Sequence, residues 1–163
     1  NEDALTKPLM LPRYAELHCL THFSFLRGAS HPEELAERAH ALGYAALAVT
    51  DECSVAGVVR AHLAAKPLGL KLIVGTELAL ADGPKLVLLA CDREGYGDLA
   101  ELVTRGRTRA RKGTYRLTRA DFDAGLGGCL ALLVPGETPD VEHAHWVAAR
   151  FPARAWIAAE LHC

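Results

Sequence analysis

The sequence predicts an α/β fold with a largely parallel sheet, arranged as a barrel in preference to a doubly wound sheet. Short apolar runs typical of buried strands alternate along the chain with segments of helical periodicity, which is the pattern of repeated strand–helix units. In such folds the functional side chains gather at the carboxyl ends of the strands. The chain contains neither GxGxxG nor GxxxxGK(S/T), so no motif supports dinucleotide or P-loop chemistry.

The first predicted elements are a strand and a helix. Residues 14–20 (YAELHCL) have the character of a strand. Residues 30–43 (SHPEELAERAHALG) predict a helix, because Ser30 and Glu33 have the spacing of a capping box, apolar residues recur at helical intervals, and Gly43 follows them.

The middle of the chain predicts three further strands and a helix. Residues 45–50 (AALAVT) form a continuous apolar run that stops at two acidic residues, as expected of a strand buried on both faces. Residues 55–69 predict a helix that is closed by proline and glycine. The runs at 71–80 and 84–92 predict two strands, and the intervening turn sequence ADGP allows them to pair as a hairpin.

The C-terminal part continues the alternation of elements. Residues 93–112 predict a helix that enters a basic tail, and residues 116–125 predict a short polar helix or turn. Residues 129–135 (CLALLVP) predict a buried strand, residues 141–152 a helix, and residues 153–163 a last strand.

Composition places the 163-residue chain, with a formal net charge of −2, among ordinary globular domains. No apolar stretch approaches the ~20 residues that span a bilayer, and no signal peptide is apparent, so we expect a cytoplasmic protein without membrane contact. The five cysteines are widely spread without a CxxC pair, which favours neither a disulfide framework nor a zinc ribbon. The chain starts at Asn1 and stops at Cys163 directly after an apolar run, so we expect a fragment of a longer protein.

Two histidines near the first strand raise the question of a metal site. In a strand, residues i and i+2 share a face about 7 Å apart, whereas residues i and i+4 lie about 13 Å apart. His18 has Leu20 at i+2 and His22 at i+4, so the histidines could share an ion only if the chain bends sharply between them. A simple hydrogen-bonding role for His18 at a strand end is the favoured interpretation.

Three motifs in order carry a specific family resemblance. AELHCLTHFSFLRGAS at 15–30, TDECSVAG at 50–57 and KLIVGTEL at 71–78 together resemble the polymerase and histidinol phosphatase (PHP) domain at the N-terminus of bacterial C-family, DnaE-type DNA polymerase III alpha subunits. The likeness extends over essentially the whole chain and is greatest to the error-prone, damage-inducible branch of that family.

This resemblance implies a distorted (β/α)7 PHP barrel, truncated before its last strands. Residues 1–13 would be an N-terminal extension and residues 14–163 the incomplete PHP domain. The palm, fingers and thumb domains of the polymerase would lie downstream of Cys163, together with the catalytic aspartates of nucleotidyl transfer. No catalytic residue is therefore expected in this chain.

In active family members a cluster of His, Asp, Glu and Cys binds up to three metals for phosphoester hydrolysis. Carried over by position, three residues could still act as ligands in a degenerate site: His18, Glu52 and Glu77. Glu52 stands where active family members have a histidine. Four other ligand positions hold residues that cannot replace the family ligands: Leu20, Arg27, Lys85 and Pro135.

Two of these replacements also oppose a metal electrostatically. Arg27 and Lys85 would place positive charges where divalent cations should lie. At ~4 Å and an effective dielectric constant of ~20, two unit charges interact by roughly 4 kcal/mol, and a divalent ion would feel about twice that repulsion. The same cations could pair with Glu52, Glu77 or Asp51, which would convert a metal site into a salt-bridged plug.

Other polar residues have simpler interpretations. Asp51 ends its strand before a turn, where Asp commonly caps a helix. Cys19 follows His18 in a strand and must point to the opposite face, toward the core. His143 and His145 lie two residues apart on a predicted helix, hence on divergent faces, and we expect them at the surface or an interface.

The resemblance implies an error-prone DNA-directed DNA polymerase that acts in DNA repair and damage-induced mutagenesis, in which this domain is structural. No cofactor is expected here, and Mg²⁺ would serve the parent polymerase. Expected partners are the downstream polymerase domains, DNA through the parent protein, and mutagenesis accessory proteins. A basic run is either a solvated loop or a contact surface for DNA or a neighbouring domain: Arg105, Arg107, Arg109, Arg111 and Lys112.

Two alternatives stay open. One is an active metal-dependent PHP phosphoesterase or 3′–5′ exonuclease with zinc or manganese, in which His18, Glu52 and Glu77 are ligands and water is the nucleophile. The other is a pure protein-interaction module, which the sequence does not separate from a structural domain.

Overall fold

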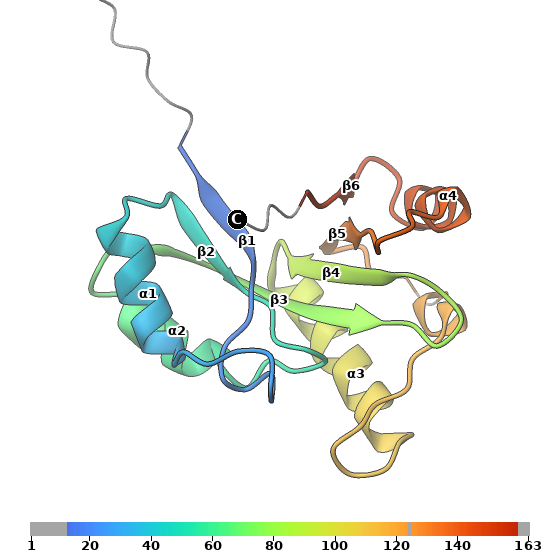
Figure 1. The fold of residues 1–163 in the computed structure, drawn as a ribbon, viewed down its shortest axis with the longest axis horizontal. Coiled ribbons are helices and arrows are strands. Elements are labelled where there is room, and N and C mark those ends of the chain that lie inside the picture. Colours follow the sequence, from blue (N-terminus) through green and yellow to red (C-terminus); the bar gives the residue numbers. More distant parts are fainter. Residues whose placement is uncertain (1–12, 124, 160–163) are drawn as a thin grey trace, which may run out of the picture.

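Six strands pair in the order in which they occur along the chain and form one curled sheet (Figure 1). The computed structural model describes residues 13–123 and 125–159. The strands are β1 (Ala15–Cys19), β2 (Ala46–Val49), β3 (Lys71–Ala79), β4 (Lys85–Ala90), β5 (Cys129–Val134) and β6 (Ala155–Ile157). The predicted extension at 1–13 and the final ELHC at 160–163 lie, apart from Arg13, outside the described residues.

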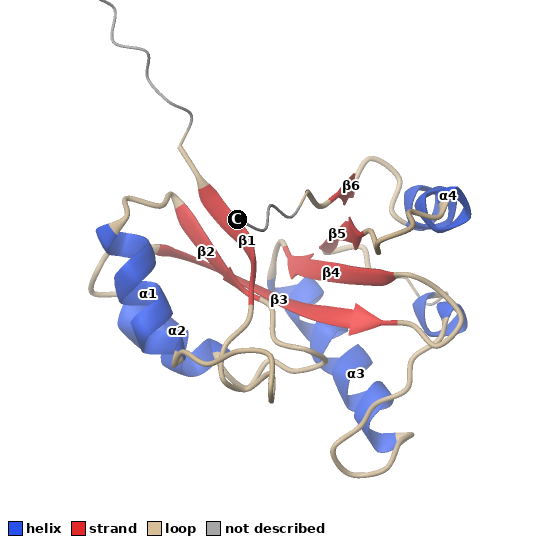
Figure 2. Ribbon diagram, viewed as in Figure 1, coloured by secondary structure: helices blue, strands red, loops and turns tan. Residues whose placement is uncertain are grey.

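Four α-helices in the described part of the chain pack against the strands of the sheet (Figure 2). The helices α1 and α2 contact each other and pack beside β2 and β3, α3 contacts β3 and β4, and α4 contacts β5 and β6. Their bounds are α1 (Pro32–Ala41), α2 (Val58–Ala65), α3 (Arg93–Thr108) and α4 (Val141–Arg150), with a 3₁₀ turn at Arg119–Phe122. No helix among the described residues is long and apolar enough to cross a membrane.

The expectation of a largely parallel sheet is wrong for the central strands. β4 runs antiparallel to both β3 and β5, whereas β1–β2, β2–β3 and β5–β6 are parallel pairs. The predicted hairpin of β3 and β4 explains the difference, because a parallel connection needs a crossover of a dozen or more residues. The short ADGP turn, closed by a hydrogen bond from the Leu80 amide to the Pro84 carbonyl, has no room for one.

The apolar run of β4 is continuous because the strand is buried on both faces. Leu86 and Leu88 belong to the main core cluster beside α3, while Val87 and Leu89 belong to a second cluster on the opposite face. Side chains alternate between the two faces of a strand, so both faces must be apolar here. The second face borders an open hollow of about 1260 Å³ between the inner surfaces of β1, β3, β5 and β6.

The helix α1 begins one residue later than its capping-box pattern predicts. His31 occupies the N-cap position, and its amide donates a hydrogen bond to the Glu34 carboxylate at 2.8 Å. The carbonyl of Ser30 instead accepts a hydrogen bond from the His22 amide at 2.9 Å. Ser30 therefore closes the preceding loop and does not cap the helix.

A core substitution with a matched surface control tests this packing. Phe122 is 0% exposed and contacts the rings of Trp146 and Phe151, whereas Phe25 is 83% exposed. Phe122→Ala should lower the free energy of unfolding by about 3–5 kcal/mol, because it leaves a cavity in the core. In the isolated domain, where Phe25 is exposed, Phe25→Ala should change it by less than about 0.5 kcal/mol. Urea denaturation of both variants measures this, and equal effects would contradict the described core.

Candidate functional site

The site forms where the chain leaves β2 and runs beside β3. Glu52 makes an isolated parallel bridge with Glu77 of β3. The Cys53 amide donates a hydrogen bond to the Glu77 carbonyl at 2.8 Å, and the Glu77 amide donates to the carbonyls of Thr50 and Asp51. These backbone hydrogen bonds place two carboxylates from separate elements next to each other.

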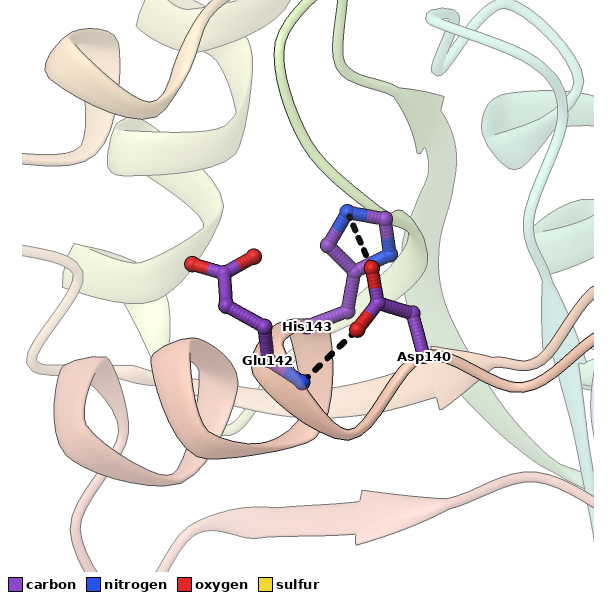
Figure 3. Close-up of side chains that lie close together, drawn as sticks. All are labelled: Asp140, Glu142 and His143. Carbon is purple, nitrogen blue, oxygen red and sulfur yellow. Dashed lines mark hydrogen bonds and ion pairs between the residues drawn. The ribbon is translucent and has the colours of Figure 1, made fainter.

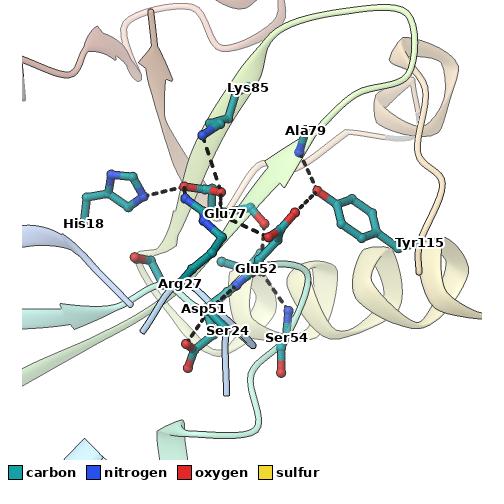
Figure 4. A network of polar contacts seen from close by, with 12 residues as sticks. His18, Ser24, Arg27, Asp51, Glu52, Ser54, Glu77, Ala79, Lys85 and Tyr115 are labelled. Atoms are coloured by element: carbon teal, nitrogen blue, oxygen red, sulfur yellow. Dashed lines mark hydrogen bonds and ion pairs between the residues drawn. The ribbon is translucent and has the colours of Figure 1, made fainter. Parts of the chain in front are cut away.

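Glu77 is the centre of the polar cluster (Figure 4). Its side chain is only 1% exposed, and His18 Nε2 lies 2.8 Å from its Oε2. Arg27 donates from its two terminal nitrogens to the two carboxylate oxygens, which is the bidentate geometry that arginine favours. Lys85 Nζ lies 3.9 Å from Oε1. Three basic side chains therefore surround one buried carboxylate.

The register of the sheet brings Lys85 to this position. Glu77 lies opposite Val87, and Ala79 lies opposite Lys85, in the antiparallel ladder of β3 and β4. Residues two apart in a strand share a face, so Lys85 is a diagonal neighbour of Glu77 and its long side chain can reach the carboxylate.

Glu52 is the second carboxylate of the cluster. Its Oε2 accepts a hydrogen bond from Arg27 Nη1 at 3.1 Å, and its Oε1 accepts one from the Tyr115 hydroxyl at 3.1 Å. The Tyr115 oxygen accepts in turn from the Ala79 amide at 2.9 Å. Burial raises the pKa of Tyr115, and the neighbouring carboxylate of Glu52 raises it further. The phenol therefore stays protonated and continues to donate to Glu52.

The interpretation of Asp51 as a helix cap is wrong. Its buried carboxylate accepts hydrogen bonds from the Thr21 amide and hydroxyl, each at 2.8 Å, and from the Ser24 hydroxyl at 2.7 Å. The helix α2 begins only at Val58, too far along the chain for Asp51 to cap it. The sequence signal for the true role is the Thr and Ser that follow the first strand, since hydroxyls are common donors to a buried carboxylate.

The loop after β1 is closed at its base. The His22 amide donates a hydrogen bond to the Ser30 carbonyl at 2.9 Å. Gly28 passes so close to Thr21 that a Cβ on it would lie 2.0 Å from the Thr21 carbonyl oxygen, so only glycine fits. The loop of residues 21–30 is thereby fixed where its arginine reaches both carboxylates.

Arg107 of the basic run contacts the back of the site. Its Nε donates to the Cys53 carbonyl at 3.0 Å, and its Nη2 donates to the Glu52 carbonyl at 2.9 Å. The guanidinium also lies over the ring of Tyr115, 5.4 Å from the centroid. Cys53 has a left-handed backbone with φ 44°, which is unfavourable for a non-glycine residue. Arg107 therefore stabilises the turn that carries Glu52.

Two other members of the basic run are also engaged within the domain. Arg105 Nη1 lies 3.9 Å from Asp121 Oδ1, and Arg109 pairs with the same carboxylate. Within the part of the chain that the structure describes, Arg111 and Lys112 are exposed and form no ion pair. A contact surface for DNA phosphates would therefore depend on these last two residues.

The charges of the cluster act strongly on Glu77. Burial alone would raise the pKa of its carboxyl group, but hydrogen bonds from His18 and Arg27, with the charge of Lys85, outweigh burial and lower the pKa to about 2. The hydrogen bond to Glu77 raises the pKa of Arg27 in return. Both groups therefore carry full charge at neutral pH.

The structure separates the other residues that the sequence singled out. The rings of His22 and His31 pack against each other with their centroids 4.3 Å apart. His18 instead faces Glu77, so His18 and His22 have different partners. Leu20 lies half-buried just after β1, and Pro135 lies half-buried just after β5. Cys19 packs against the core cluster of α1 and α2.

Sequence reasoning did not anticipate a cluster at the start of α4 (Figure 3). One potential ligand atom from each of Asp140, Glu142 and His143 lies within 4.8 Å of the others. Asp140 already accepts the Glu142 amide as the N-cap, and both oxygens of Glu142 accept from Arg119 at 2.6 and 2.7 Å. The sequence signal is an Asp-x-Glu-His pattern at a helix start, which also suits capping.

A family model for the PHP domain matches residues 16–150 of the chain. Among curated proteins, an error-prone DNA polymerase of Dechloromonas aromatica is 62% identical over 94% of the chain. Proteins of the same name are 60% identical over 91% of the chain in Methylococcus capsulatus and 56% identical over 92% in Pseudomonas fluorescens. The chain spans only 16%, 14% and 14% of the lengths of these three relatives.

Two solved structures share the fold at low sequence identity. A protein described as a metal-dependent phosphoesterase, from Bifidobacterium adolescentis, has a TM-score of 0.68 at 15% identity, covering 89% of this chain and 76% of that one. An amidohydrolase of Chromobacterium violaceum, with bound sulfate and no metal, has a TM-score of 0.62 at 16% identity, covering 88% and 76%. The predicted α/β fold, a partial PHP barrel, is confirmed.

The depressed pKa of Glu77 predicts a specific dependence of stability on pH. The pKa is about 2 in the folded protein against an ordinary 4.5, so the stabilisation is complete above the ordinary value and is lost as pH falls toward the folded one. At pH 7, Glu77→Gln should lower the free energy of unfolding by about 3 kcal/mol, since each pKa unit corresponds to about 1.4 kcal/mol.

Urea denaturation at a series of pH values measures this effect. The difference between the unmodified protein and Glu77→Gln should shrink as pH falls below 4.5. Glu101→Gln is the matched control, because Glu101 pairs with Arg105 at the exposed surface and should show no such difference. A difference for Glu77→Gln that does not vary with pH would contradict the ionised, paired carboxylate.

Proposed function

The chain belongs to the PHP domain family, and from that premise we propose that it is the N-terminal domain of an error-prone DNA polymerase acting in DNA repair and damage-induced mutagenesis. The high identity to proteins of that name supports the polymerase as the parent. Because the chain spans a small part of those relatives, the palm, fingers and thumb would lie in the rest of the polypeptide. Mg²⁺ would serve the palm, and the protein would work in the cytoplasm.

Within that polymerase we propose a structural role for this domain, with an ion-pair plug in place of a metal centre. The observation that carries this proposal is Arg27, whose guanidinium bridges Glu77 and Glu52. A divalent ion ~4 Å from one cation would be repelled by about 8 kcal/mol at an effective dielectric constant of ~20. His18, Glu52 and Glu77 thus offer their donor atoms to other side chains, and the donor set does not fit a divalent metal cluster.

The domain boundary is part of the proposal. Residues 14–163 would form the PHP domain, with its remaining strands supplied by the following sequence. The strands β1 and β6 are the outer members of the described sheet, and an open apolar hollow lies between their inner faces. Strands that pair with these edges would cover backbone groups that are otherwise left unpaired.

The second candidate function is an active metal-dependent phosphoesterase or 3′–5′ exonuclease. One observation favours it, because the potential ligands His18, Glu52 and Glu77 do lie in one cluster. The position of Arg27 between the two carboxylates opposes it. Accessory proteins of mutagenesis would be partners of the parent protein under either function.

Metal content separates the two functions. The purified protein should hold no stoichiometric zinc or manganese when its metal content is measured by inductively coupled plasma mass spectrometry. The triple variant Leu20→His, Arg27→Asp and Lys85→His should gain binding of zinc or manganese in isothermal titration calorimetry, because it removes two cations and adds three donors.

A control with the same changes elsewhere keeps composition constant. Leu42→His, Arg93→Asp and Lys112→His alter three exposed residues on separate segments and should gain no tight site. Stoichiometric, tightly held metal in the unmodified protein would refute the plug and support the phosphoesterase.

Arg111 and Lys112 provide a test of DNA contact. If they touch phosphates in the full polymerase, Arg111→Gln with Lys112→Gln should reduce the slope of log affinity against log salt by about 0.7–0.9 per lost contact. Arg38→Gln with Lys66→Gln, exposed on the α1–α2 side, should leave the slope unchanged. An unaltered slope in the first variant would exclude this DNA contact.

A further inference from the structure

The tip of the loop after β1 displays two large apolar side chains side by side in sequence. Phe25 is 83% exposed and Leu26 is 89% exposed. Leu26 also adopts a left-handed backbone with φ 62°, which a bulky residue rarely adopts, and hydrogen bonds from the Arg27 and Gly28 amides to the Ser24 carbonyl close the turn around it. Single exposed apolar residues are common on protein surfaces, but adjacent ones at a protruding tip are typical of a contact site.

Contacts of the residues before and after the tip hold it rigidly in place. The buried carboxylate of Asp51 accepts hydrogen bonds from Thr21 and Ser24, on the near side of the tip. On the far side, Gly28 packs against the Thr21 carbonyl with no room for a Cβ. A rigid element loses little conformational entropy when it docks.

Arg27 adds a tether directly beside the tip. It follows Leu26 in the chain, and its guanidinium is fastened to Glu77 and Glu52 (Figure 4). The ion pairs of the proposed plug therefore also hold the loop in the conformation that exposes Phe25 and Leu26.

We propose that Phe25 and Leu26 dock into an apolar depression on the polymerase portion of the same polypeptide, and that the Arg27 ion pairs present them for this contact. The proposal rests on the proposed function, because it requires a longer polypeptide. A phenylalanine side chain buries about 150–250 Å². Even together with Leu26, this area is well below the roughly 800 Å² per partner that a stable interface between separate proteins buries.

A partner in the same polypeptide can bind the tip in spite of this small buried area. Two domains of one chain are present to each other at high effective concentration, so a small contact is sufficient to orient them. The chain spans 16% of the length of a relative to which it is 62% identical, so most of such a polypeptide is available to supply the depression. Two other partners could contact the tip instead: a second copy of the protein, or single-stranded DNA whose bases could stack on Phe25.

Photo-crosslinking in the full-length protein identifies the occupant. Phe25→benzoylphenylalanine should crosslink within one polypeptide to a segment outside residues 1–163, which peptide mass spectrometry would locate. Val141→benzoylphenylalanine is the matched control, because Val141 is 68% exposed and lies on α4, away from the loop (Figure 1). Crosslinks to a second copy, to DNA, or only to residues 1–163 would overturn the proposal, as would a yield no higher than at Val141.

A second pair of variants tests the tether. In the protein with benzoylphenylalanine at position 25, Arg27→Gln should reduce the crosslinking yield, because the loop loses its ion pairs with Glu77 and Glu52 and keeps only its hydrogen bonds to Asp51. Lys85→Gln removes a cation from the same carboxylate without touching the loop and should leave the yield unchanged. Equal yields in the two variants would show that the ion pairs do not present the tip.

Failure of this proposal is distinguishable from failure of the proposed function. Bound metal in the unmodified protein would refute the plug and the tether through Arg27, whereas a crosslink from position 25 to a segment outside residues 1–163 would still support the docking contact. A metal-free protein whose Phe25 position crosslinks to nothing beyond residue 163 would retain the plug and refute the docking contact.

Discussion

Glu77 carries a negative charge in a buried part of the sheet, and the rest of the polar site depends on matching it. An isolated buried carboxylate costs several kcal/mol, and this cost is offset only by close cations and hydrogen bonds. Arg27, His18 and Lys85 supply them from the loop after β1, from β1 itself and from β4. The carboxylate is thereby the point at which three separate elements are joined.

A second buried carboxylate, that of Asp51, is satisfied in a different way. It accepts hydrogen bonds from one amide and two hydroxyls of the loop, and no cation is among these partners. The loop of residues 21–30 is therefore fastened twice, by hydrogen bonds to Asp51 and by the ion pairs of Arg27. Its conformation, including the exposed tip, follows from the charges beneath it, which links the polar site to the surface of the domain.

Positive charge that is clustered in the sequence is dispersed in the structure. Alternate residues of the basic run turn to different sides of α3 and of the segment after it, so Arg107 supports the turn at Glu52 while Arg105 and Arg109 pair with Asp121. A run of arginines therefore does not by itself make a surface for phosphates. The same reasoning applies to the acidic pattern at the start of α4, where capping and pairing with Arg119 engage the carboxylates.

The order of strands and helices can be predicted from the sequence, because apolar run length, helical periodicity and turn composition are local properties of the chain. Through the family resemblance, the sequence also predicts that Leu20, Arg27, Lys85 and Pro135 stand at the positions of metal ligands. The pairing of the polar side chains, in contrast, is set by the three-dimensional fold. The bond from Thr21 to Asp51 joins residues 30 positions apart, and that from Arg107 to the Glu52 carbonyl joins residues 55 apart. Such contacts depend on strand register and on the paths of loops, and these are set by packing of the whole domain.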